Sequence, residues 1–161
     1  MTRTNRRQFV GLPAAAAIAA PLVGAAALQE QPLRAMDVKD YLWSLATWVN
    51  FTTTVDTFKA GDPETPVKGI AVAWMSYTWA LKRAVELGCN LFVTHEPTFY
   101  DHVDKPRPEI LNSEVAKAKR QLIEDSKLVV LRCHDVWDQY PKIGVTEAWA
   151  STLSCDCLPS T

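Results

Sequence analysis

Two apolar runs in this sequence end in the same way, with a histidine that is followed at once by an acid. The run at 90–94 leads into His95, and the run at 128–133 leads into His134. The segment between them has apolar residues at helical spacing, which predicts a strand, a crossover helix and a second strand. Such a unit makes the two strands parallel, so their carboxyl ends lie at one edge of the sheet. We therefore expect both histidines at that edge, where open α/β sheets bind their ligands.

The acids beside the two histidines make this edge a candidate site for a divalent metal. Glu96 follows His95, Asp135 follows His134, and Asp138 comes four residues after His134. Imidazole nitrogen and carboxylate oxygen are ligands of borderline divalent metals. Glu96 and Asp135 face the site only if the chain leaves strand geometry there, whereas the spacing of Asp138 matches one helical turn. The sequence has three histidines, and polar capping of the two strand ends is the alternative to metal binding.

The first residues, 1–27, have the pattern of a signal peptide. Arg6 and Arg7 precede Phe9, an uncharged Ala-rich stretch follows, and residues 25–27 supply a small-residue cleavage site. This arrangement is typical of a secretory signal, and the arginine pair resembles a twin-arginine address. We therefore expect an exported protein, periplasmic or extracellular, with no stable membrane anchor after cleavage. An uncleaved amphipathic anchor is the alternative.

Composition indicates one ordinary globular domain after that signal. A chain of 161 residues is normally one domain. Hydrophobic content of 48% with 22% charged residues excludes a mostly disordered chain. The formal net charge of -1 gives no indication of a nucleic-acid partner. Residues 154–161 have no periodicity, and we expect an unstructured tail there in preference to half of a metal clip made by Cys155 and Cys157.

The order of the remaining segments predicts an α/β domain over residues 28–153. The expected elements are a helix capped by Asp37, a strand at 67–74, a helix from Ser76 or Thr78 to Gly88, the His95 strand, a helix at about 110–125, the His134 strand and a short helix at 147–153. Segment 50–64 carries a run of threonines and ends in a turn signal. Strands this apolar predict a mainly parallel sheet covered by helices on both faces.

His102 and Cys133 are also chemically reactive, but we do not expect either to bind the metal or to act as a nucleophile. His102 lies in a proline-rich loop and is interpreted as a surface residue, with a lid-borne acid or base as the alternative. Cys133 next to His134 suggests a nucleophile and its base, but neighbouring strand residues point to opposite faces. We therefore do not expect a thiol mechanism. The sequence also has no Gly-rich phosphate loop and no G-x-S-x-G elbow.

Several segments resemble the Nif-three-like family of dinuclear-metal proteins, also described as GTP cyclohydrolase I type 2 homologues. The resemblance covers roughly residues 36–153. It rests on Gly61-Asp62-Pro63, Val67-Lys68-Gly69-Ile70, Ala84 to Leu91, Thr94-His95-Glu96-Pro97 and Cys133 to Asp138. It implies an α/β fold, a two-metal centre and a toroidal homo-hexamer.

The resemblance also implies which residues bind metal. His95, His134 and Asp138 match metal ligands of the family, with Asp138 as the bridging carboxylate. Glu96 takes the place of the second histidine in the commoner His-His-Pro motif, which makes the site more negative. Asp135 would orient a ligand from outside the coordination sphere.

The function implied by the resemblance is metal-dependent hydrolysis of a small molecule with Zn, Fe or Mn as the cofactor. A non-catalytic metal-binding or assembly module and a truncated inactive remnant are the alternatives. The family also has a final His-x-x-x-Glu ligand pair near its C-terminus, and no histidine follows His134 here. We therefore expect the N-terminal half of the family fold, incomplete relative to the whole, with a half-built metal site.

Overall fold

A four-stranded sheet with the order β1-β4-β3-β2 carries the two histidine motifs. The computed structural model describes residues 31–105 and 107–153, so the expected signal peptide and tail lie outside the described residues. The strands are β1 (Phe58–Ala60), β2 (Ile70–Ala73), β3 (Leu91–Thr94) and β4 (Val129–Arg132). The helices are α1 (Ala35–Leu45), α2 (Thr78–Glu86), α3 (Pro108–Leu111), α4 (Glu114–Asp125), α5 (Asp135–Asp138) and α6 (Val145–Thr152).

Strands β2, β3 and β4 are parallel, which confirms the expected mainly parallel α/β fold. Leu91 of β3 pairs with Ile70 on one side and with Val129 on the other. Thr94 and Arg132, the last residues of β3 and β4, are also paired. The two segments that follow these strands therefore start side by side at the same edge of the sheet.

Strand β1 was not predicted from the sequence. It lies within segment 50–64 and pairs antiparallel with β4, with Phe58 opposite Leu131. A strand of three residues is too short to show an alternating pattern, which explains the omission. Because of β1, strand β4 has a neighbour on both sides, as β3 already has.

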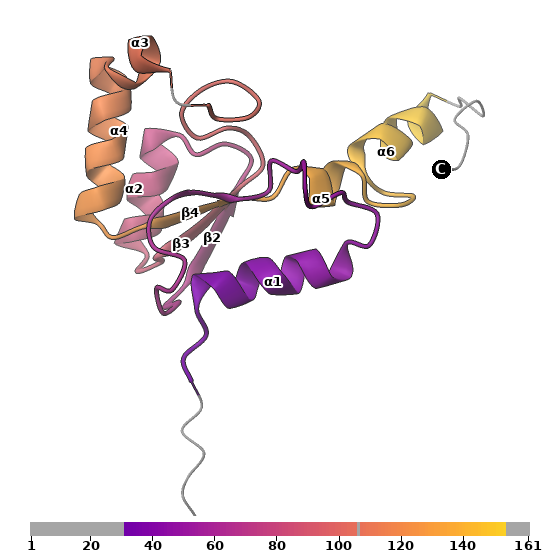
Figure 1. The fold of residues 1–161 in the computed structure, drawn as a ribbon, viewed down its shortest axis with the longest axis horizontal. Coiled ribbons are helices and arrows are strands. Elements are labelled where there is room, and N and C mark those ends of the chain that lie inside the picture. Colours follow the sequence, from indigo (N-terminus) through magenta and orange to yellow (C-terminus); the bar gives the residue numbers. More distant parts are fainter. Residues whose placement is uncertain (1–30, 106, 154–161) are drawn as a thin grey trace, which may run out of the picture. The chain divides into compact units, whose positions relative to one another are not determined.

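Helices cover the two faces of the sheet unequally. Leu81 of α2 and Ile123 of α4 pack on Phe92 and Val130 on one face, and Val38 and Leu42 of α1 pack against the other face. Figure 1 shows α2 and α4 side by side, with α1 on the opposite side of the strands. Helices flank both faces as expected, but the cover is incomplete at β2, where Val72 is 76% exposed.

Three predicted helix boundaries need correction. The helix start assigned to Asp37 lies earlier, with Arg34 as the N-cap, and the Asp37 carboxylate accepts the Arg34 backbone N–H at 2.8 Å. The single helix expected at 110–125 is two, because Ser113 caps α4 through its hydroxyl and separates it from α3. The helix expected at 147–153 begins at Val145.

The end of α2 agrees with the sequence. Gly88 has a positive φ of 76°, a conformation that glycine adopts without strain, and it follows the C-cap Leu87. In the part of the chain that the structure describes, no helix combines the length and apolar character that crossing a membrane requires.

Candidate metal centre

The carboxyl ends of β3 and β4 bring His95 and His134 into contact. Their rings are stacked with centroids 4.5 Å apart and an interplanar angle of 22°. Each histidine directly follows its strand, since β3 ends at Thr94 and the β4 segment continues through Cys133 to His134. The convergence expected from parallel strands is therefore present.

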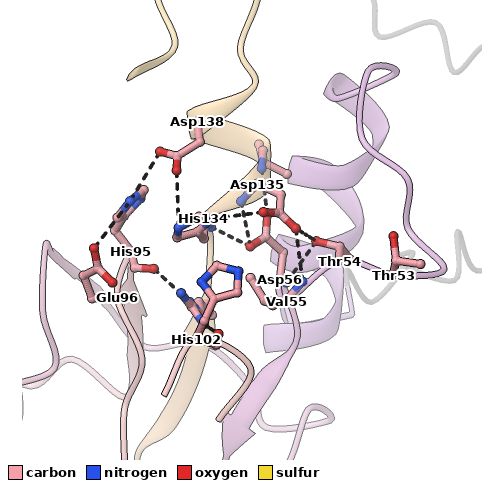
Figure 2. Close-up of polar contacts among 12 residues, drawn as sticks. Thr53, Thr54, Val55, Asp56, His95, Glu96, His102, His134, Asp135 and Asp138 are labelled. Carbon is pink, nitrogen blue, oxygen red and sulfur yellow. Dashed lines mark hydrogen bonds and ion pairs between the residues drawn. The ribbon is translucent and has the colours of Figure 1, made fainter. Parts of the chain in front are cut away.

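The short helix α5 brings the Asp138 carboxylate to both histidines. The chain enters α5 directly after His134, so Asp138 lies one turn further on and returns to the same side. Its Oδ1 is 3.4 Å from His95 Nε2, and its Oδ2 is 3.3 Å from His134 Nε2. Figure 2 shows the carboxylate facing both imidazoles. The three residues offer ligand atoms that all lie within 4.8 Å of one another.

Asp135 sets the tautomer of His134. Its Oδ1 lies 3.0 Å from His134 Nδ1, while its Oδ2 accepts hydrogen bonds from the Thr54 hydroxyl at 2.7 Å and the Val55 N–H at 3.1 Å. Burial raises the pKa of Asp135, but the hydrogen bonds from Thr54, His134 and Val55 outweigh it and hold the pKa below its ordinary value. An ionised Asp135 keeps the proton on Nδ1 and leaves Nε2 free to bind a cation.

The environment of His95 keeps its imidazole neutral. The residue is buried, and this burial lowers its pKa below the ordinary value. Asp138 and Glu96 raise the pKa and His134 lowers it, and the balance remains a downward shift. The ring also stacks on Trp74 with centroids 3.9 Å apart. Since a metal ligand must be an unprotonated imidazole, this environment suits metal binding.

Asp56 holds the start of α5 and was missed in the sequence. It is only 1% exposed. Its Oδ1 accepts the backbone N–H groups of His134 and Asp135 at 2.5 and 3.1 Å, and its Oδ2 accepts that of Val136 at 2.8 Å. One carboxylate thus caps the helix that carries Asp135 and Asp138 and that begins directly after His134. Its partners are about eighty positions away, so local sequence patterns give no signal of this role.

Arg132 holds the backbone at His95 and at His102. The side chain is buried at the end of β4, where its Nε donates to the His95 carbonyl at 2.9 Å. Its Nη1 donates to the carbonyl of His102. The sequence offered one signal of this role, a charged residue within an otherwise apolar strand. A buried arginine is rare without partners, so such a residue indicates polar contacts.

Glu96 and His102 lie at the border of the three-residue group. Glu96 Oε1 is 4.0 Å from His95 Nε2, and Glu96 does not belong to the group of close ligand atoms. His102 is exposed, yet its ring stands edge-on to His134 with centroids 4.9 Å apart. The interpretation of His102 as a plain surface residue therefore missed its position beside the centre.

Cys133 is a free, half-buried cysteine beside the candidate centre. Burial raises its pKa to about 12, with a smaller contribution from Asp56. A protonated sulfur is a poor nucleophile. The expectation that Cys133 and His134 do not form a catalytic pair stays a prediction.

The donor set fits a divalent cation. Asp138 Oδ1 and His95 Nδ1 are buried, and neither has a hydrogen-bond partner among the residues that the structure describes. Two imidazoles and a carboxylate match the ligand preference of zinc, iron and manganese. A bound cation would compensate the buried carboxylate oxygen, which is costly to leave unpaired.

Comparisons with known proteins support the family resemblance. No family model matches the chain. A GTP cyclohydrolase 1 type 2 homolog of Chlamydia pneumoniae is 27% identical over 113 residues, which are 68% of this chain and 43% of that protein.

Solved structures agree with that relative. A Bacillus cereus protein related to NIF3 has a TM-score of 0.59 at 14% identity, over 81% of this chain and 36% of its own. Reduced HcgD from Methanocaldococcus jannaschii has a TM-score of 0.58 at 18% identity, over 74% of this chain and 46% of its own. These likenesses establish the fold, and the chain spans less than half the length of the relatives that it matches.

Proposed function

We propose that this chain, which resembles the Nif-three-like proteins over less than half of their length, binds divalent metal ions and serves metal-dependent hydrolysis. The observation that carries the proposal is the position of the Asp138 carboxylate. One of its oxygens faces His95 Nε2 and the other faces His134 Nε2. This position supports the proposal because Asp138 would hold metal together with both histidines.

The chain's own residues divide into ligands and supports. His95, His134 and Asp138 would hold the ions, and Glu96 would add an oxygen on the His95 side, 4.0 Å from its Nε2. Asp135 orients the His134 ring, and Asp56 holds the backbone of α5. Support of this kind fixes ligand geometry before a metal arrives.

Bound divalent ions would polarise a substrate and lower the pKa of a coordinated water, which is the chemistry of metal-assisted hydrolysis. His102 is placed to take part in proton transfer, because its exposed ring stands beside His134. The Arg132 side chain donates a hydrogen bond to the backbone carbonyl of His102. This bond ties the loop that carries His102 to the end of β4.

Measuring metal content tests the binding part of the proposal. The full chain, purified without chelator, should contain about one to two equivalents of metal by plasma mass spectrometry. His95→Ala, His134→Ala and Asp138→Ala should each lose the metal, because each removes one of three converging ligands. Asp125→Ala is the matched control, since it removes an exposed carboxylate on α4. Metal that persists in Asp138→Ala would contradict the ligand assignment.

A second measurement separates an enzyme from a non-catalytic metal-binding module. Three close protein ligands leave coordination positions for water, as catalytic sites do, whereas structural sites are closed by protein. The chain loaded with Mn²⁺ should therefore enhance water-proton relaxation. A metal-loaded chain without that enhancement would favour the binding module. Assembly into a homo-hexamer and export remain predictions for the whole protein.

A further inference from the structure

An apolar cavity lies directly beside the candidate metal centre, at the carboxyl ends of β2 and β3. Its volume is about 250 Å³. The residues that line it are Val72, Ala73, Trp74, Val93, Thr94, His95, Cys133 and Trp137. No lysine, arginine, aspartate or glutamate is among them. The walls therefore favour an uncharged group over an ion.

Two tryptophans that line this cavity are accessible, as is Val72. Trp74 is 56% exposed and Trp137 is 43% exposed, although both are large apolar side chains. Trp74 directly follows β2, and Trp137 lies on α5. Indole faces pack well against flat rings, with a gain beyond the area that is buried.

The cavity adjoins the candidate metal centre at His95, which lines it. One face of the His95 ring stacks on Trp74, and the ring also stacks on His134. On α5, Trp137 immediately precedes Asp138, whose carboxylate faces both histidines. A molecule that reaches the ligand atoms of His95 and Asp138 can thus place an attached group against the two indoles.

We propose that this cavity binds an uncharged aromatic or heteroaromatic ring of the substrate, next to the group that reacts at the metal centre. This inference rests on the proposed function for the position of the reacting group. The size agrees with a ring, since a dry cavity of about 150 Å³ holds benzene. The cavity would thus select substrates with a ring adjacent to the hydrolysed bond.

Two hydroxamates test the proposal on the metal-loaded full chain. Acetohydroxamate and benzohydroxamate carry the same metal-binding group, but only the second carries a ring. Calorimetric titration should show benzohydroxamate binding about tenfold tighter, after correction for their affinities for the free ion. Trp137→Ala should reduce this advantage to about twofold or less with metal content unchanged. Trp149→Ala, an exposed tryptophan on α6, should keep it.

A metal-free arm keeps the test independent of the proposed function. Indole added to the metal-free full chain should shift the side-chain N–H signals of Trp74 and Trp137 in ¹⁵N-correlated spectra, while Trp149 stays in place. If the chain binds no metal, the proposed function fails and this arm alone decides the cavity. Equal affinity for both hydroxamates in the loaded chain would overturn the proposal. So would indole binding that leaves both cavity tryptophans unshifted, as expected if a second copy of the chain covers them.

Discussion

At the scale of single residues, the candidate centre depends on carboxylates with different roles. Asp138 faces the ligand nitrogens of both histidines. Asp135 faces the opposite nitrogen of His134, so it fixes the ring without occupying the ligand position. Both lie on one turn of α5, and the helix turns these two nearby carboxylates toward different nitrogens.

We predict that Asp135→Asn weakens metal binding without removing it. The substitution removes the negative charge that favours a proton on His134 Nδ1, so Nε2 is less consistently available. The loss in affinity should be about tenfold, as for other groups that orient a metal-bound histidine. Competition with a coloured chelator measures it, with Asp125→Asn as the control. An unchanged affinity would show that Asp135 serves only Thr54 and Val55.

At the scale of elements, α5 is the unit that completes the site. It has four residues, too short to be stable by itself. Its stability comes from Asp56, which accepts the first backbone N–H groups of the helix from a segment that precedes β1. The segment before β1 and the segment after β4 are held together by the antiparallel pairing of those strands.

We predict that Asp56→Ala destabilises the fold and the metal site together. Buried N–H groups at the start of α5 would lose their acceptor, at a cost of about 2 kcal/mol or more. Urea unfolding measures the loss of stability. Metal content should also fall, because the backbone that Asp56 holds positions both His134 and Asp138. Asp56→Asn retains an acceptor oxygen and should lose less. Full metal content in a destabilised Asp56→Ala protein would disprove the link.

At the scale of the whole molecule, the three candidate ligand residues come from segments that only the folded chain brings together. His95 follows β3, and His134 and Asp138 follow β4, with the α3 and α4 segment between them. A ligand that binds the folded state and not the unfolded chain stabilises the fold by mass action. Metal binding should therefore be visible in the stability of the full chain.

We predict that the metal-loaded chain melts about 10 °C higher than the metal-free chain when free metal is at a hundred times its dissociation constant, which corresponds to about 2.7 kcal/mol. Scanning calorimetry measures this difference. It should vanish in Asp138→Ala, which removes the shared ligand. A loaded chain that melts at the metal-free temperature would mean that the metal is held elsewhere, with no preference for this folded site.

Local patterns in the sequence determined much of this protein. Apolar runs and helical spacing predicted three parallel strands and a helical segment in each of the two connections between them. They also predicted the convergence of His95 with His134, because parallel strands end at one edge. The four-residue spacing of Asp138 and His134 also encodes their contact, since one helical turn joins them.

Only the tertiary structure determined which residues stabilise the segments that follow β3 and β4. Asp56 meets α5 from 78 positions away, and Arg132 reaches the His95 carbonyl across 37 positions. Strand β1 exists through its pairing with β4, and the cavity walls come from β2, β3 and α5. Hydrogen bonds and packing between distant segments leave no period in the sequence, so only the folded chain determines these partners.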